Sequence, residues 1–386
     1  MTIPFIDLKA QQKRIYSRIT QNIEAVLAHG KYIMGPEIMD LEQRLAGYAG
    51  VKHAIACSSG TEALLMALMA YNVGPGDAIF TTPFTFVATA EVISLLGATP
   101  VFVDIEPDTF NINPDCLKEA INAVKTGDIQ KHPLPKGFES LKPKGIISVD
   151  LFGQTADYDR INAMAKQEGL FVIEDAAQSY GAEYGGKKAC SLSNIAATSF
   201  FPAKPLGCYG DAGMIFTDDE GLCDILRSIR VHGKGSEKYD NIRIGINGRC
   251  DTIQAAILLA KFDIFPEEIG LRQDVAGNYS GLLKDIDHIK VPFVKDGNLS
   301  AWAQYSIMSE NKDAIMGALK KDGIPTAVYY PRPLHLQGAY AYLQYKNGDF
   351  PVSEKTSGSI FSLPMHPYLA GQDQERIVEV IKGVTC

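Results

Sequence analysis

Hydrophobic residues show two alternating patterns of spacing over the first 230 residues of the chain. Segments with helical spacing alternate with short apolar runs that are typical of buried strands. Helical spacing predicts helices at 15–28, 38–48, 61–71, 86–96, 114–123, 157–168 and 219–230. The apolar runs predict strands at 53–57, 78–81, 100–103, 145–149, 170–174, 195–200 and 212–217.

Such alternation predicts an α/β fold, in which a seven-stranded, mostly parallel sheet is sandwiched by helices. Residues 125–144 interrupt the rhythm with three prolines and five lysines, which indicates a surface excursion. After residue 251 a long helical pattern leads into a mixed region, with strands expected near 303–308 and 325–330 and a helix near 372–383. We therefore expect an N-terminal arm (1–35), a large domain (36–250) and a smaller C-terminal α+β domain (251–386).

Composition narrows the classes of function. The net charge of −8 and the pI near 5.5 disfavour nucleic acid as a partner. The seven cysteines are an odd set without a CxxC pair, which favours reduced thiols over disulfides or a structural metal. The N-terminus lacks a signal-peptide pattern, and no apolar run is long enough to span a membrane. We expect a cytoplasmic protein without a metal site.

Two segments carry the most informative chemistry, FVIEDAAQSYG (171–181) and ATSFFPAKPLGCYGDAG (197–213). Asp175 ends an apolar strand, and Lys204 follows the next strand within a turn rich in proline and glycine. This pair suits pyridoxal phosphate, because a lysine forms a Schiff base with its aldehyde and an acid keeps its ring nitrogen protonated. A surface lysine and a magnesium-binding acid are the alternatives. The latter requires a phosphate loop, and the one match, GAEYGGKK (181–188), lacks the Ser or Thr after its lysine.

Several polar residues could complete such a site. Ser58, Ser59, Gly60 and Thr61 precede the helix at 61–71, so they could bind a phosphate, although the same pattern is also an ordinary helix cap. Ser199 could supply a second hydroxyl to the phosphate. Phe86 could stack on the pyridine ring or belong to the core. Gln178 could donate to the phenolic oxygen of the cofactor or cap a helix.

Taken together, the segments resemble the DegT/DnrJ/EryC1/StrS sugar aminotransferases, which are fold type I pyridoxal phosphate enzymes. The matching segments cover nearly the whole chain and run in the family's order: FIDLKAQQ, GKYIMGPE, SSGTEAL, FTFVATAE, VDLFGQTADYD, IEDAAQSYGA, SFFPAKPLGCYGDAG, RIGINGRCDTIQAA and SLPMHPYL. The resemblance implies a homodimer with shared active sites, in which Asn247 reaches the cofactor phosphate of the neighbouring subunit. It also assigns the Schiff base to Lys204, the ring nitrogen to Asp175, the phenolic oxygen to Gln178, stacking to Phe86, and the phosphate to Ser59, Gly60, Thr61 and Ser199.

The same resemblance implies amine transfer from L-glutamate to a nucleotide-linked keto-sugar for surface polysaccharide synthesis. The nearest branch acts on a UDP-linked 3-keto-N-acetylhexosaminuronic acid. Arg249 could bind the uronate or serve the interface, with Tyr329 and His335 as further substrate contacts. The alternatives are an aminotransferase for a dTDP- or UDP-linked keto-6-deoxysugar, a dehydratase, and a non-catalytic regulator that binds the cofactor. Dehydratases of the family carry histidine where this chain has Lys204, and many relatives carry histidine where this chain has Tyr329.

Overall fold

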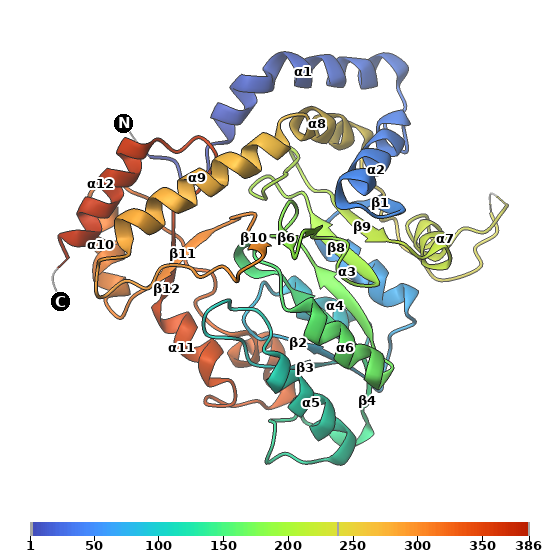
Figure 1. The fold of residues 1–386 in the computed structure, drawn as a ribbon. Coiled ribbons are helices and arrows are strands. Elements are labelled where there is room, and N and C mark those ends of the chain that lie inside the picture. The colour runs from blue at the N-terminus through green and yellow to red at the C-terminus, as the bar shows by residue number, and fades with distance from the viewer. Residues whose placement is uncertain (1–2, 238, 385–386) are drawn as a thin grey trace.

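The computed structural model describes residues 3–237 and 239–384. A seven-stranded sheet lies between two layers of helices, which confirms the predicted α/β architecture (Figure 1). In spatial order its strands are β1 (His53–Cys57), β9 (Gly213–Thr217), β8 (Ile195–Ser199), β5 (Phe171–Asp175), β4 (Lys142–Val149), β2 (Asp77–Thr81) and β3 (Thr99–Phe102). Only β9 runs antiparallel to its neighbours in this sheet, so six strands end at the same edge.

Successive side chains of each strand point to opposite faces, and each face buries its own set of helices. One face packs against α3 (Gly60–Ala70), α4 (Ala88–Leu95) and α7 (Glu220–Ile229). The other face packs against α2 (Pro36–Ala49), α5 (Pro114–Thr126), α6 (Tyr158–Glu168) and α8 (Thr252–Phe262). Burial on both faces explains why the strands read as continuous apolar runs in the sequence.

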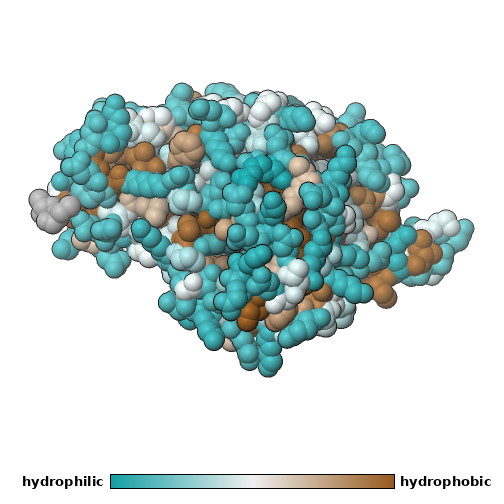
Figure 2. Space-filling view, turned by 60° about the horizontal axis from the view of Figure 1, so that its bottom comes forward, coloured by the Kyte–Doolittle hydropathy of each residue, from teal (hydrophilic) through white to brown (hydrophobic). Residues whose placement is uncertain are grey.

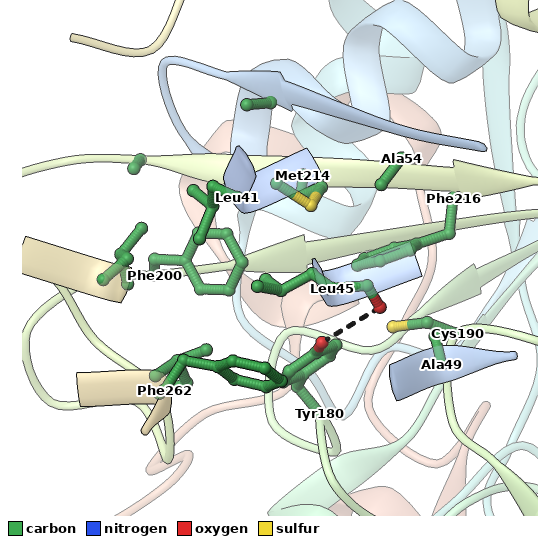
Figure 3. Close-up of a cluster of buried hydrophobic side chains, with 14 of the residues drawn as sticks. Leu41, Leu45, Ala49, Ala54, Tyr180, Cys190, Phe200, Met214, Phe216 and Phe262 are labelled. Carbon is green, nitrogen blue, oxygen red and sulfur yellow. Dashed lines mark hydrogen bonds between the residues drawn. The ribbon is translucent and has the colours of Figure 1, made fainter. Parts of the chain in front are cut away.

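A hydrophobic cluster between α2 and the sheet anchors the segment that follows β5 (Figure 3). Tyr180 is buried in this cluster, where its ring stacks on Phe216 with centroids 5.8 Å apart. Its hydroxyl donates to the carbonyl of Leu45 at 3.4 Å. Because Tyr180 comes shortly after Asp175 in the chain, this packing fixes the backbone on the carboxyl side of that acid.

The C-terminal region forms a second core around a two-stranded antiparallel sheet. The elements of this region are α9 (Phe265–Leu283), β10 (Asn298–Leu299), β11 (Tyr305–Met308), α10 (Lys312–Lys321), α11 (Pro351–Ser359), β12 (Ile360–Leu363) and α12 (Gly371–Lys382). The sequence placed the second strand at 325–330, which is wrong. Only Ala327 forms a bridge there, with Ser362, and β12 is the partner of β11.

Two helices also differ from their predicted bounds. The first, α1 (Leu8–His29), begins seven residues early, because the Asp7 side chain accepts a hydrogen bond from Ala10 N and caps it. The long pattern after residue 251 is interrupted between α8 and α9, where Pro266 removes a helical hydrogen-bond donor. The strands β6 (Glu183–Tyr184) and β7 (Lys187–Lys188) form a short hairpin that pairs with β10.

Part of the C-terminal region packs on the large sheet rather than on the second core. Leu334 N donates to Pro83 O at 2.8 Å, and the rings of Tyr340 and Phe350 pack edge-on against Phe102 of β3. Asp104, just after β3, accepts hydrogen bonds from Val352 N and Ser353 N at 2.9 Å. These contacts bring the segment before α11 to the edge of the large sheet, and the domain boundary at 251 stays a prediction.

Candidate active site

The carboxyl ends of β5 and β8 bring Asp175 and Lys204 into one site. Asp175 is the last residue of β5 and pairs in register with Ala197 of β8. Lys204 lies in the turn that follows β8, where its N–H donates to Phe201 O at 2.9 Å. A Cβ on Gly207 would lie 2.6 Å from Pro202 O, so this turn has room only for glycine. The tight turn directs the lysine back toward the strand edge.

The electrostatics of the pair suit a bound cation. Burial raises the pKa of Asp175, while the Thr89 hydroxyl at 2.8 Å, the Ala177 N–H at 3.3 Å and the Lys204 ammonium favour its ionised form. Burial likewise lowers the pKa of Lys204, and Asp175 opposes that shift. The site therefore offers a desolvated carboxylate that gains from a further positive charge, and an amine that loses its proton more readily than an ordinary lysine.

The N-terminus of α3 forms a tight cup against Ser199, at the end of β8. The Ser59 hydroxyl accepts from Glu62 N at 3.1 Å, so Ser59 caps α3, while the first helical amides at Gly60 and Thr61 have no acceptor within the helix. A Cβ on Gly60 would lie 2.6 Å from the Cβ of Ser199, and one on Gly213 would lie 2.4 Å from Ser59 O. Both glycines let β8, β9 and α3 approach closely.

The cup contains an unsatisfied buried hydroxyl. Ser58 Oγ has no hydrogen-bond partner among the described residues, although its N–H donates to Gly248 O at 3.1 Å. Buried polar atoms are rarely left unpaired, so an acceptor bound in the cup would satisfy this hydroxyl together with the helix N-terminus. The residues present therefore fit a phosphate group, and the ordinary cap at Ser59 coexists with that role.

Gln178 is held from two sides, and one of its contacts was not predicted. Its Oε1 accepts from Phe152 N at 2.7 Å, and its Nε2 donates to the hydroxyl of Tyr330 at 3.2 Å. Tyr330 is a site residue that the sequence reasoning missed, although it is adjacent to Tyr329 in the TAVYYPRPL segment. Its ring centroid lies 6.4 Å from that of Phe86.

Phe86 belongs to the open side of the site rather than to the core. Its side chain is 55% exposed, whereas Phe84, two residues earlier, is fully buried. An exposed aromatic ring beside Tyr330 is available to stack on a planar ligand. The exposure thus favours the stacking interpretation over the core interpretation for Phe86.

The remaining predicted residues lie in different surroundings. Asn247 is exposed, and its Oδ1 accepts from Arg249 Nε at 2.9 Å, so these two residues contact each other. Tyr329 is half-buried beside Tyr330, whereas His335 is buried, with Nε2 3.0 Å from Glu354 Oε1 and its ring against Phe350. Burial lowers the pKa of His335. The imidazole is engaged in packing, and its role as a substrate contact stays a prediction.

Three general features concern the described residues as a whole. No group of three or more His, Cys, Asp or Glu residues among them is arranged to hold a metal ion. Within residues 3–237 and 239–384, none of the helices combines the length and the apolar character needed to cross a bilayer. Six cysteines are unpaired thiols, five of them buried, and Cys386 lies outside the described residues.

The fold and this site together define a pyridoxal phosphate enzyme of fold type I. The sequence matches the DegT/DnrJ/EryC1/StrS aminotransferase family over residues 13–382, and the chain belongs to this family. The chain is 50% identical over 367 residues to the UDP-2-acetamido-2-deoxy-3-oxo-D-glucuronate aminotransferase of Pseudomonas aeruginosa, covering 95% of this chain and 96% of that protein.

Solved structures agree with this assignment. A DegT/DnrJ/EryC1/StrS aminotransferase from Brucella abortus superposes with a TM-score of 0.93 at 51% identity, over 99% of both chains. NtdA from Bacillus subtilis, solved with bound pyridoxamine phosphate (PMP), has a TM-score of 0.86 at 29% identity and matches 99% of this chain and 85% of its own. Pyridoxal phosphate is the cofactor of this chain, and the enzyme is an aminotransferase.

Proposed function

We propose that the enzyme transfers an amino group from L-glutamate to a nucleotide-linked keto-sugar. The observation that carries this proposal is the position of Lys204, whose pKa burial lowers, and the buried carboxyl of Asp175 at the carboxyl ends of the neighbouring strands β8 and β5. The 50% identity to the Pseudomonas aeruginosa enzyme favours a UDP-linked 3-keto-N-acetylhexosaminuronic acid as the acceptor. The amino sugar formed would serve surface polysaccharides such as the O-antigen of lipopolysaccharide.

Each residue has a distinct task in this proposal. Bound pyridoxal phosphate would supply an aldehyde that accepts the amine and a ring that withdraws electrons from the reacting carbon. Asp175 would hold the proton of the ring nitrogen, and Thr89 and the Ala177 N–H keep its carboxylate oriented. Lys204 Nζ would hold the cofactor between turnovers and, when released, would accept and return the proton of the reacting carbon.

The surrounding residues position the cofactor. Gly60, Thr61, Ser59 and Ser199 would bind the phosphate at the start of α3, joined by the free hydroxyl of Ser58. Phe86 would stack on the ring, and the Gln178 amide, oriented by Phe152 N–H, presents its NH₂ group to the phenolic oxygen. Tyr330 excludes water from one side of the site. Lys204 favours amine transfer over the dehydration that a histidine would indicate.

We also propose a homodimer that completes the site. A segment after α7, residues 231–237 and 239–245, protrudes from the globule at the right of Figure 1, and hydrophobic residues gather on this protrusion in Figure 2. Ile244 is 86% exposed there. Further exposed apolar side chains are Tyr32, Ile33, Met39, Phe201 and Ile242. Burying them against a second copy would bring Asn247 to the partner's cofactor phosphate.

Substrate recognition would involve the same interface. Arg249 holds the Asn247 carbonyl through Nε, which leaves the two terminal nitrogens of its guanidinium for the uronate carboxylate. Tyr329 would contact the substrate from the other side of the site. The free thiols and a nucleotide-linked substrate favour the cytoplasm as the site of action.

A colour cycle tests this proposal. The purified protein loaded with pyridoxal phosphate should be yellow, should lose its visible absorbance on adding L-glutamate, and should regain it on adding the UDP-linked 3-keto uronic acid. A 3-keto sugar without the carboxylate should restore the colour more slowly, and Arg249→Met should abolish that preference. Failure of every keto-sugar nucleotide to restore the colour would overturn the substrate class.

A further inference from the structure

Two acids lie behind the cofactor site, on the opposite face of the sheet from Asp175. Asp150 directly follows β4, and Glu174 precedes Asp175 in β5. Glu174 pairs in register with Ser148, so Asp150 and Glu174 point to the same face while Asp175 points to the face covered by α3 and α4. Both side chains are fully buried, and none of the roles proposed above uses them.

Both oxygens of each carboxyl group accept hydrogen bonds. Asp150 Oδ1 accepts from Ala156 N and from the Tyr158 hydroxyl, both at 3.0 Å, and its Oδ2 accepts from the Ser179 hydroxyl at 2.8 Å. The two oxygens of Glu174 accept from Cys190 N at 2.6 Å and from Leu192 N at 3.0 Å. These contacts join four chain segments behind the site. They also show that both acids are held in place by hydrogen bonds in the folded protein.

The two acids lack a cation to neutralise them. The titratable groups that act on the pair in the described part of the chain are Tyr158, Cys190 and, from the other face of the sheet, Asp175, and none of them carries a positive charge. Burial raises the pKa of Asp150 to about 7, with a smaller contribution from the charge of Asp175 and against the hydrogen bonds that the carboxyl accepts. Burial, and after it the charge of Asp150, holds the pKa of Glu174 well above its usual range. Two adjacent buried carboxyls cannot both ionise at low cost.

We propose that Glu174 and Asp150 share a single proton and act as a positioning unit for the segment that carries Asp175 and Gln178. The segment is held at two points. Asp150 N–H donates to Asp175 O at 3.1 Å, and the Ser179 hydroxyl donates to the Asp150 carboxyl. Gln178 lies between these points, so the unit fixes both residues that the proposed function places on the cofactor ring. The inference rests on that function for its purpose, but the shared proton does not depend on it.

The proposal has a defined pH dependence. A carboxyl whose pKa is raised on folding binds its proton more tightly in the folded state than in the unfolded state. Its contribution to stability is therefore complete below the pKa of the unfolded chain and is lost as the pH rises through the folded pKa values of the pair, of which that of Asp150 is about 7. Loss of the shared proton leaves two negative charges behind Asp175. We expect the apoprotein to lose stability and the cofactor site to lose order over the same pH interval.

Two substitutions at Asp150 distinguish the effect of the shared proton from the effect of the hydrogen bonds that Asp150 makes. Asparagine keeps a carbonyl for Ala156 N and Tyr158, and its amide can donate to Ser179 Oγ and to an ionised Glu174, so it replaces the shared proton permanently. Alanine removes all of these contacts. Glu139→Gln, at an exposed position, is the control for removal of one acid. Melting of each apoprotein and its affinity for pyridoxal phosphate would be measured from about pH 5 to about pH 9.

The expected result is a difference in slope. Relative to Asp150→Asn, the wild-type apoprotein and Glu139→Gln should lose roughly 1–2 °C of melting midpoint per pH unit as the pair deprotonates. Asp150→Ala should melt lower throughout and bind pyridoxal phosphate at least about tenfold more weakly at the acidic end, whereas Asp150→Asn should bind as the wild type does there. Equal slopes for wild type and Asp150→Asn would exclude the shared proton. Unchanged affinity in Asp150→Ala would exclude the positioning role.

These outcomes are distinguishable from a failure of the proposed function. The melting series uses apoprotein and needs neither cofactor nor substrate. If no variant bound pyridoxal phosphate while the slopes differed as predicted, the shared proton would be supported. Its proposed role in positioning the cofactor-binding residues would be refuted.

Discussion

Gly60→Ala tests whether the start of α3 binds the cofactor phosphate. A Cβ at residue 60 would lie 2.6 Å from Ser199 Cβ, 3.1 Å from Ser199 Cα and 3.2 Å from Ser199 Oγ. Two of these atoms belong to the strand end rather than to a flexible side-chain tip, so the helix and β8 must move apart. The movement would displace the first amides of α3 and the Ser199 hydroxyl together, which is where the phosphate is proposed to bind.

The magnitude follows from the cost of overpacking. Inserting a methyl group into a closely packed contact costs about 1–3 kcal/mol. If the bound phosphate requires the original spacing, this cost appears in the affinity, because each 1.4 kcal/mol changes a dissociation constant about tenfold. We therefore expect pyridoxal phosphate to bind about 5- to 150-fold more weakly to Gly60→Ala than to the wild type. Titration of the apoprotein, followed by visible absorbance, measures this directly.

Gly47→Ala is the matched control, because Gly47 lies within α2 and a Cβ there meets no atom within 4 Å. Alanine in an open helical position stabilises by about 0.4–1 kcal/mol, so this variant should melt slightly higher and bind the cofactor normally. If Gly60→Ala bound pyridoxal phosphate as tightly as Gly47→Ala, the phosphate would not be bound at the start of α3.

Three further predictions concern other parts of the site and fold. Tyr330→Phe removes the acceptor of Gln178 Nε2. We expect cofactor affinity to fall about 2- to 12-fold, which corresponds to the loss of one ordinary hydrogen bond. Unchanged affinity in the same titration would show that Gln178 needs no second hydrogen bond to hold it. Glu42→Ala removes the carboxylate that lies 2.5 Å from the buried guanidinium of Arg230 and leaves it, among the described residues, only the Ala56 carbonyl as a partner. Denaturant unfolding should report a loss of about 3–5 kcal/mol. A loss below about 1 kcal/mol would place this pair with exposed ion pairs instead. Because burial lowers the pKa of Lys204, the rate at which apoprotein captures pyridoxal phosphate should rise with pH, and the midpoint of that rise should lie below the pKa of an ordinary lysine. A midpoint at the ordinary lysine pKa would contradict the desolvation of Lys204.

Local sequence was enough to predict where Asp175, Lys204 and Gly60 lie relative to the strands and helices. Asp175 ends an apolar strand, Lys204 follows the next strand in a Pro- and Gly-rich turn, and Gly60 begins a helix after a strand. Parallel strands bring such points to one edge of a sheet, so their proximity follows from the alternation of strands and helices alone. The seven strands were found for the same reason, because each is a continuous apolar run.

The parts that were missed depend on contacts between distant segments. Tyr330 meets Gln178 across 152 positions of sequence, and β12 was overlooked because its identity as a strand comes from pairing with β11. The burial of His335 against Glu354 and Phe350 also comes from contacts that the sequence does not show, and its role as a substrate contact stays a prediction. The carboxyl pair of Asp150 and Glu174 is likewise invisible in the sequence, since two strands must align before the acids meet.

The measurement that tests the central claim most directly is the fate of nitrogen in a complete reaction. The protein would be incubated with pyridoxal phosphate, L-glutamate labelled isotopically at nitrogen, and the UDP-linked 3-keto uronic acid. The mass of the sugar nucleotide product would then be determined by mass spectrometry. The account predicts that the wild type transfers the label to the sugar and that Lys204→Ala does not. A labelled amino sugar formed equally by Lys204→Ala, or a wild-type product that has lost water and gained no nitrogen, would contradict it.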